Sequence, residues 1–137
     1  MSLEEKVQTI LENHRIGILS TIRDGKPHSC FMIFQHDGYT LYIGANEETQ
    51  KIGDIRNNEH VHVLLGYEGK GWNDNFLEIE ATATLVEDEN QKQKYWSEEL
   101  TKWVQDPSDP NYILVKITPS TIAYIENAGS EPEVLTL

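Results

Sequence analysis

The residues with the clearest potential for chemistry lie in the segment Tyr39–Asn58. A strand-like run in this segment ends at Gly44-Ala45-Asn46, and a short helix that carries Thr49, Lys51 and Arg56 is predicted to follow. Hydroxyl groups, cations and the free N–H groups at the start of a helix can together bind an anion such as phosphate. The same spacing also fits a helix whose lysine is simply solvated. The segment therefore predicts a candidate anion site, which other parts of the chain must support.

Three other features have reactive side chains, and the sequence argues against a catalytic or metal role for each. Cys30 has no histidine and acid in a catalytic arrangement with it, so it fits a small buried residue. His60 and His62 share a strand face but lack a third ligand for zinc. The glycine-rich loop Glu68–Asn75 lacks the Gly-Lys-Ser/Thr ending of a nucleotide P-loop. Its Trp72 could instead cap a planar ring.

The composition restricts the compartment and the partners of the protein. The 137 residues include one cysteine, which excludes an internal disulfide, and the length suits a single domain over residues 1–137. The chain starts with charged residues and has no apolar run near the roughly 20 residues of a membrane helix, so a cytoplasmic location is expected. The net charge of −12, from 23 acidic and 11 basic residues, opposes binding to nucleic acid or to an anionic membrane. An anionic ligand must therefore be held by a local cluster of positive groups.

Short strands account for most of the structure predicted around the anion site. Alternating hydrophobic residues and turn signals predict up to seven strands, at Ile16–Ile22, His28–Gln35, Tyr39–Ile43, His60–Tyr67, Leu77–Leu85, Tyr112–Ile117 and Thr121–Ile125. Asp-Gly pairs at positions 24–25 and 37–38 favour tight turns, so the first three strands are expected to form an antiparallel meander. The polar tail, residues 126–137, is expected to be loosely ordered.

Three helices are predicted between the strands. The first follows the capping box Ser2-Leu3-Glu4-Glu5 and ends at about Asn13, and the second is the short helix after Asn46. The third starts near Glu87–Asn90, and its tryptophans are expected to pack into the core. Its apolar face consists of Tyr95, Trp96, Leu100, Trp103 and Val104. Antiparallel strands in excess, joined by short turns, indicate an α+β fold, mainly β, built on a barrel or a strongly coiled sheet rather than a doubly wound α/β fold.

Several segments follow one another in the order found in a known superfamily. They are Asp24-Gly25-Lys26-Pro27-His28, Met32, Asp37-Gly38-Tyr39-Thr40-Leu41-Tyr42 and Thr49-Gln50-Lys51. In this order and spacing the chain resembles the pyridoxamine 5′-phosphate oxidase-like FMN-binding split-barrel superfamily. The later runs Trp96–Trp103 and Asp109–Pro119 resemble its general stress protein 26 branch. The resemblance covers nearly the whole chain and implies an antiparallel split β-barrel.

The resemblance also implies a homodimer that binds FMN at the interface between its subunits. The phosphate-binding segment of the family corresponds to Thr49, Gln50 and Lys51 in this chain. The residues implied to line the isoalloxazine ring lie on the second strand and are Ser29, Cys30, Phe31 and Met32. Ala45 and Asn46 are implied to lie beside the ring, at the end of the next strand.

Two positions depart from the family pattern. Cys30 stands where the stress proteins commonly have an arginine directed at the phosphate, and Tyr124-Ile125 stands where a Tyr-Trp pair is often found. Glu47 and Glu48 also adjoin the expected anion site. Loss of a charged contact weakens the binding of a phosphate, so weaker FMN binding or a different ligand is an alternative expectation.

The activity implied by the resemblance is that of an FMN-dependent oxidoreductase. Because a flavin carries the redox chemistry itself, such a protein needs no catalytic triad or acid pair, and none is evident here. A second hypothesis is a stress protein that binds or senses a flavin, or a related phosphorylated ligand, without turnover. A third is a split barrel that binds haem or the deazaflavin F420. The sequence identifies neither the electron donor nor the small-molecule redox partner.

Overall fold

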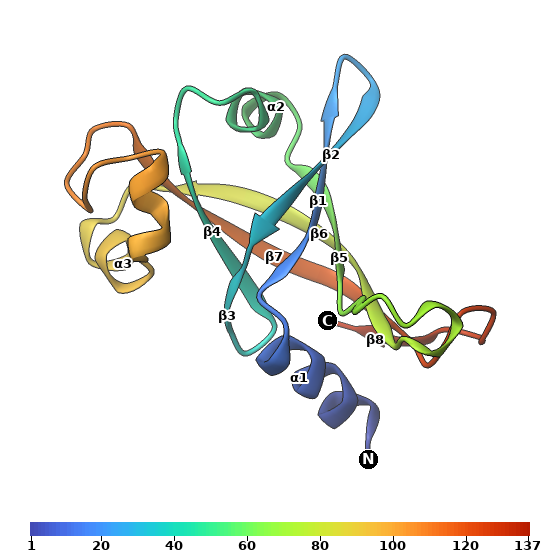
Figure 1. Cartoon of the computed structure of the whole chain (residues 1–137). Helices are drawn as coiled ribbons and strands as arrows, with labels where there is room; N and C mark the ends of the chain where they lie inside the picture. Colours follow the sequence, from blue (N-terminus) through green and yellow to red (C-terminus); the bar gives the residue numbers. More distant parts are fainter.

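Eight strands and three α-helices make up the fold in the computed structural model, which describes residues 1–137. The strands are β1 Ile16–Arg23, β2 Lys26–Ile33, β3 Gln35–Asp37, β4 Thr40–Asn46, β5 His60–Leu65, β6 Phe76–Val86, β7 Tyr112–Ile125 and β8 Glu133–Thr136. The helices are α1 Leu3–Asn13, α2 Gln50–Asn57 and α3 Glu89–Lys94, with 3-10 segments at Gly71–Asn73 and Glu98–Lys102. All strands belong to one sheet with the order β2-β1-β5-β6-β7-β4-β3, and β8 pairs with β7. Figure 1 shows this antiparallel sheet curled into a half-barrel, which confirms the predicted α+β split-barrel class.

Alternation along the strands separates a buried face from an exposed one. On β6, Leu77, Ile79 and Ala81 are buried, whereas Glu78 and Glu80 are exposed. The inward side chains join residues of α1, α2 and the other long strands in one hydrophobic cluster. The predicted buried face of β6, including its small alanines Ala81 and Ala83, is therefore confirmed, and it packs inside a half-barrel. None of the helices combines the length and the hydrophobicity that a membrane-spanning helix requires.

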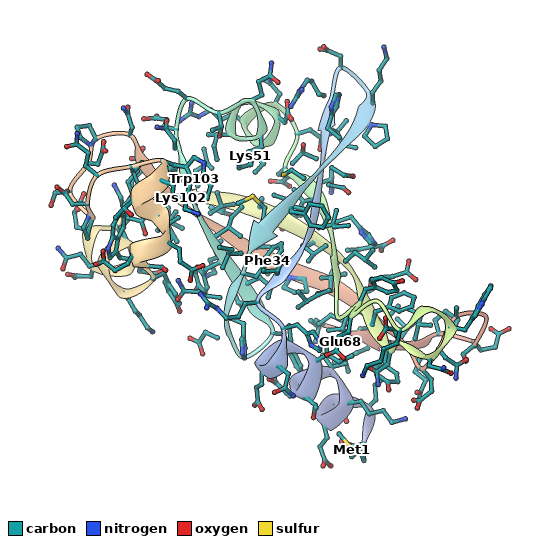
Figure 2. The ribbon with its side chains drawn as sticks, in the orientation of Figure 1. Met1, Phe34, Lys51, Glu68, Lys102 and Trp103 are labelled. Atoms are coloured by element: carbon teal, nitrogen blue, oxygen red, sulfur yellow. The ribbon has the colours of Figure 1, made fainter.

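The predicted meander of the first three strands is wrong. The strand expected over His28–Gln35 divides at Phe34, which is buried and donates its N–H to the carbonyl oxygen of Arg15 at 2.6 Å. On one side of this break β2 pairs with β1, and on the other side β3 pairs with β4. β2 and β3 therefore occupy opposite edges of the sheet, and the chain crosses between the edges at Phe34, near the middle of the molecule in Figure 2. The Asp-Gly turns specify tight reversals but not which strands lie beside each other.

The long third helix predicted from the sequence is also wrong. α3 spans only six residues, and Ser97 then caps a separate 3-10 segment with its side chain. Serine competes with the backbone for hydrogen bonds and favours a helix start over a helix interior. Between the two segments Tyr95 stacks on Tyr42 with a ring-centroid separation of 3.9 Å. Trp103 follows the 3-10 segment and is 54% exposed, so it is not a core residue.

The last part of the chain is more regular than expected. The two strands predicted around Pro119 form the single strand β7, with a register shift opposite β6 between Glu80 and Ala81. Pro119 lies between the part of β7 that pairs with β4 and the part that pairs with β8. Because neither strand pairs with β7 at this position, the missing N–H of proline costs no hydrogen bond on that side. The tail expected to be loosely ordered instead forms β8, which pairs with residues Thr121–Tyr124 of β7.

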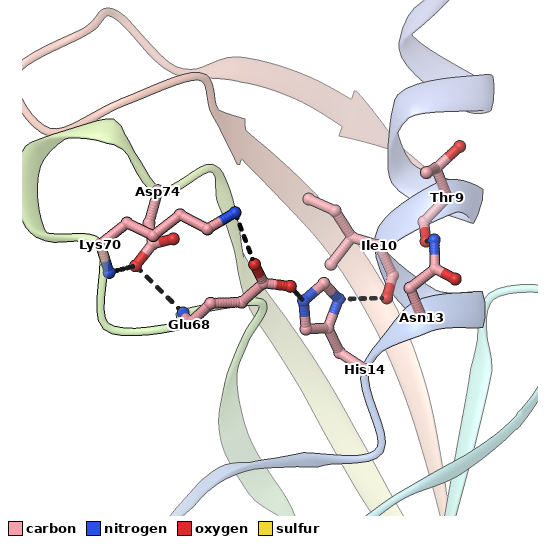
Figure 3. A network of polar contacts seen from close by, with 7 residues as sticks. All are labelled: Thr9, Ile10, Asn13, His14, Glu68, Lys70 and Asp74. Atoms are coloured by element: carbon pink, nitrogen blue, oxygen red, sulfur yellow. Dashed lines mark hydrogen bonds and ion pairs between the residues drawn. The ribbon is translucent and has the colours of Figure 1, made fainter.

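Helix α1 is fixed at both ends. Ser2 and Glu5 form the predicted capping box, and His14 follows the last turn with both ring nitrogens facing acceptors (Figure 3). Nδ1 lies 2.9 Å from the carbonyl oxygen of Ile10, and Nε2 lies 2.7 Å from Oε2 of Glu68. Both contacts are hydrogen bonds when the ring carries a proton on each nitrogen. The hydrogen bond from Lys70, which has the larger effect, and the hydrogen bond from His14 hold the pKa of Glu68 below its usual value. The network ties α1 to the loop between β5 and β6.

Candidate functional site

Two adjoining cavities lie between β2, the end of β4, the start of α2 and the 3-10 segment Glu98–Lys102. The larger has a volume of about 400 Å³ and is mostly apolar, and the smaller has a volume of about 310 Å³ and is mostly polar. Cys30, Thr49 and Lys51 line both of them, and Cys30 is exposed rather than buried as predicted. Figure 2 shows Lys51 and Trp103 close together on this side of the molecule, away from Glu68. The site therefore has an apolar compartment and a polar compartment that meet at three residues.

The apolar cavity is open to solvent and bounded by wide hydrophobic surfaces. Its lining residues are Ile16, Cys30, Phe31, Met32, Ile33, Gly44, Ala45, Asn46, Thr49, Lys51, Leu100 and Trp103. Phe31 is 77% exposed and Ile16 is 66% exposed, which is unusual for residues of these types. Mostly apolar walls with a few polar groups are typical of sites for small organic molecules and cofactors.

Strand β4 positions the wall that faces β2 across the apolar cavity. A Cβ atom built on Gly44 would lie 2.6 Å from Cδ1 of Leu100, so only glycine allows this close approach. The Asn46 Nδ2 group donates to the carbonyl oxygen of Trp103 at 3.0 Å. Leu100 and Trp103 were missed as site residues because the helical pattern assigned them to the core. The N-cap signal at Ser97 was the one sequence feature that indicated a second helical segment here.

The polar cavity lies at the start of α2. Its lining residues are Thr21, Arg23, His28, Ser29, Cys30, Thr49, Gln50 and Lys51. The backbone N–H groups of Gln50 and Lys51 donate to no group of the protein, and Lys51 forms no ion pair. Thr49 is the N-cap residue, but its hydroxyl donates to the carbonyl oxygen of Asn46 at 2.9 Å and does not cap the helix. Free N–H groups and a free cation at a helix start make this cavity suitable for an anion.

Arg56 was a candidate anion ligand in the sequence, and the structure directs it elsewhere. Its Nη2 lies 2.7 Å from Oε1 of Glu47, and Arg56 lines neither cavity. The ion pair compensates one of the two acidic residues that adjoin the site. The second acidic residue, Glu48, lines neither cavity.

Three residues near the polar cavity form a contact network that the sequence did not indicate. Arg23 donates from Nε to Oδ1 of Asp54 and from Nη2 to Oδ2, each at 2.9 Å. The Thr21 hydroxyl also donates to Oδ2 of Asp54, at 3.0 Å. The hydrogen bonds from Arg23, the largest cause, hold the pKa of Asp54 below its usual value. Arg23 was missed because it precedes an Asp-Gly turn, and its partner lies 31 residues away in the chain.

All nine residues expected at the site line one or both cavities. The apolar cavity contains Cys30, Phe31, Met32, Ala45, Asn46, Thr49 and Lys51, and the polar cavity contains Ser29, Cys30, Thr49, Gln50 and Lys51. Two other candidates lie apart from them. Trp72 is exposed in the loop between β5 and β6 and lines neither cavity, and His60 and His62 belong to no cluster of potential metal ligands.

Comparisons with known proteins agree with this architecture. Residues 3–126 match the family model described as pyridoxamine 5′-phosphate oxidase. General stress protein 26 of Bacillus subtilis (strain 168) is 39% identical over 132 residues, which cover 96% of this chain and 94% of that protein. A crystal structure of general stress protein 26 from Bacillus anthracis str. Sterne is 44% identical, covers 100% of both chains and superimposes with a TM-score of 0.89. The chain therefore belongs to the pyridoxamine 5′-phosphate oxidase family, in the branch of general stress protein 26.

Proposed function

We propose that the chain binds FMN and acts as a flavin-dependent oxidoreductase. The observation that carries this proposal is the pair of cavities that meet at Cys30, Thr49 and Lys51. FMN has a planar aromatic ring system at one end and a phosphate at the other, so the apolar compartment suits the faces of the ring and the polar compartment suits the phosphate. The isoalloxazine ring would lie in the apolar cavity, and the phosphate would lie in the polar cavity beside α2.

The residues of the apolar cavity fit a flat ring held mainly by contact. Phe31 and Trp103 supply exposed aromatic surface on two walls, and the cavity contains no carboxylate and no histidine. Bound FMN would supply the hydride and electron transfer. The chain would orient the ring against β2, hold the phosphate at Lys51 and keep water from one face of the ring.

We further propose that the protein is a homodimer whose second subunit covers the open side of the apolar cavity. Phe31 on the edge strand β2, Ile16 and Trp103 are all more than half exposed around this opening. An exposed apolar patch beside an unpaired strand edge favours association with another chain.

Light scattering tests this dimer. Phe31→Asp should convert the protein to a monomer and weaken FMN binding. Trp72→Asp changes an equally exposed aromatic residue outside the site and should leave the dimer intact. A wild-type monomer at micromolar concentration would exclude the dimer.

A second candidate function is binding or sensing of a flavin without turnover. The observation that favours it is the absence of a carboxylate or histidine in the apolar cavity, where a proton donor would have to act on a substrate. Oxidation of NADH or NADPH by the FMN-loaded protein, compared with free FMN at the same concentration, separates the two functions. A rate above that of free FMN supports the oxidoreductase, and a rate equal to it supports the binding protein.

The visible absorption spectrum of the purified protein, followed by titration with FMN, tests the cofactor. We expect either flavin bands in the purified protein or quenching of FMN fluorescence on titration. A colourless protein that does not quench FMN at tens of micromolar would exclude FMN as the cofactor. Haem or F420 would be recognised by its own absorption bands.

A further inference from the structure

We propose that Arg23, held in place by Asp54, is the second cation of the polar cavity and binds the same phosphate group as Lys51. Arg23 lines this cavity together with Lys51, and the two residues come from different elements, β1 and α2. The inference rests on the proposed function and deepens it, because it assigns a ligand contact to a residue outside the phosphate-binding segment.

The contacts of Arg23 leave one end of its guanidinium free. Asp54 occupies Nε and Nη2, whereas Nη1 donates to no group of the protein. Asp54 is only 6% exposed and also accepts the hydroxyl of Thr21, so its carboxylate is fixed. The side chain of Arg23 is 30% exposed. A planar guanidinium fixed along one edge loses little freedom when its other edge binds a ligand.

The charges around the polar cavity favour an anion despite the acidity of the whole chain. Asp54 lies behind Arg23 and does not line the cavity, so the positive end of this ion pair faces the ligand. Lys51 has no ion-pair partner, and no carboxylate is among the lining residues. The ordinary net charge of a phosphate ester at neutral pH is about −1.5 to −2. Lys51 supplies the unpaired positive charge, and the free edge of the Arg23 guanidinium and the N–H groups at the start of α2 supply further hydrogen-bond donors to the phosphate oxygens.

Titrations with three ligands and two variants test the role of Arg23. FMN carries the phosphate, riboflavin has the same ring without it, and inorganic phosphate lacks the ring. Arg23→Ala should weaken FMN binding roughly tenfold or more, the usual effect of losing a charge-assisted hydrogen bond. Riboflavin binding should not change. Arg23→Lys tests the geometry, because one ammonium group that binds Asp54 offers no second edge to the ligand. Arg23→Lys should therefore weaken FMN binding as well. If Arg23→Ala does not fold, the FMN affinity of Arg23→Lys decides whether Arg23 binds the phosphate.

Lys26→Ala is the matched control. Lys26 lies opposite Arg23 on the same hairpin, is exposed, and lines neither cavity, so its removal lowers the positive charge by the same amount. We expect FMN binding to be nearly unchanged in this variant. An equal loss in Lys26→Ala and Arg23→Ala would show a general charge effect and would overturn the inference.

The remaining outcomes separate this inference from the proposed function. Unchanged FMN affinity in a folded Arg23 variant overturns the inference but leaves FMN as the cofactor. If the wild-type protein binds no FMN, the proposed function fails, and inorganic phosphate then decides the role of Arg23. Phosphate binding that weakens in the Arg23 variants supports the anion site, and phosphate binding that is absent or unaffected overturns it.

Discussion

Lys51 is the one side chain that both cavities share and that carries an unpaired positive charge. Lys51→Ala should weaken FMN binding at least about tenfold and leave riboflavin binding unchanged, because only FMN carries the phosphate. Titration followed by flavin fluorescence measures both affinities. Lys102→Ala is the control, since this lysine lies beside Trp103 but lines neither cavity. Equal FMN affinity in Lys51→Ala and wild type would reduce Lys51 to a solvated helix residue.

Asp54 links the same cavity to the stability of the fold. Its pKa is lowered in the folded state, mainly by hydrogen bonds from Arg23, so the ionised form contributes stability above the unfolded pKa of about 4. This contribution is lost as the pH falls through the lower folded pKa. Asp54→Asn should therefore lower the free energy of unfolding by about 1–3 kcal/mol at pH 7.

Urea denaturation at several pH values measures the effect of Asp54→Asn. The difference in stability between wild type and variant should be constant from pH 7 to about 5 and should narrow below about pH 4. A difference that is independent of pH down to about 2 would show that the carboxylate charge is not what Arg23 and Thr21 stabilise.

At the scale of elements, the close packing of β4 against the 3-10 segment shapes the apolar cavity. Gly44→Ala would place a methyl group 2.6 Å from Cδ1 of Leu100, so the Leu100 side chain, which lines the apolar cavity, must shift. Overpacking of this kind typically costs about 1–3 kcal/mol. FMN and riboflavin should lose affinity by the same factor, because the wall contacts the ring and not the phosphate.

Gly53→Ala is the matched control for Gly44→Ala. A Cβ atom at Gly53, on α2, meets no atom within 4 Å, and alanine favours a helix more than glycine does. Flavin binding should be unchanged and the protein equally stable or slightly more stable. A Gly44→Ala protein that binds both flavins normally would show that the segment adjusts without moving the wall.

The elements also show how far the sequence predicts the site. The segment Thr49–Lys51 was found because its polar residues follow a strand and begin a helix, which is a local pattern. Arg23 was not found and Trp103 was assigned to a helical core, because the contact that positions each of them is long-range. Arg23 is fixed by Asp54 on another element, and Trp103 by Asn46 at the end of β4. Local patterns identify the helix start that forms one part of the site. Only the fold shows which residues, distant in sequence, form the rest of the site.

At the scale of the whole molecule, periodicity predicted the class of fold and missed part of its connectivity. Alternation identified β5 and β6 because one face of each is buried, and β-branched residues identified β1. It did not identify the break at Phe34, since tight turns on both sides fit a meander equally well. It also did not predict β8, in which only Leu135 is partly buried and whose order comes from pairing with β7. The order of strands in the sheet depends on contacts far apart in sequence.

Strand β8 covers the half of β7 that β4 does not reach. Leu135 packs against the core, and Glu133 forms an ion pair with Lys6 of α1 at 3.2 Å. A chain that ends after Gly129 should lose about 1–2 kcal/mol of unfolding free energy, from the uncovered apolar surface. Urea denaturation measures this loss, and Leu137→Ala is the control, because it keeps the hydrogen bond from the N–H of residue 137 to the carbonyl oxygen of Ser120. A truncated protein of wild-type stability would mean that β8 does not contribute to the folded state.

Tyr124 gives an independent readout of the same truncation. Burial of the ring, the larger cause, and the hydrogen bond to Glu126 raise the pKa of Tyr124 to about 12. Because the neutral form is favoured in the folded state, its contribution to stability is complete below the unfolded pKa of about 10 and is lost as the pH rises through the folded value. Truncation after Gly129 keeps Glu126 but uncovers the ring, so an absorbance titration of the phenol should show Tyr124 ionising at a lower pH than in the full chain. Tyr124→Phe identifies its contribution to the titration. An unchanged titration of a truncated protein that remains folded would show that β7 and α1 bury Tyr124 without β8.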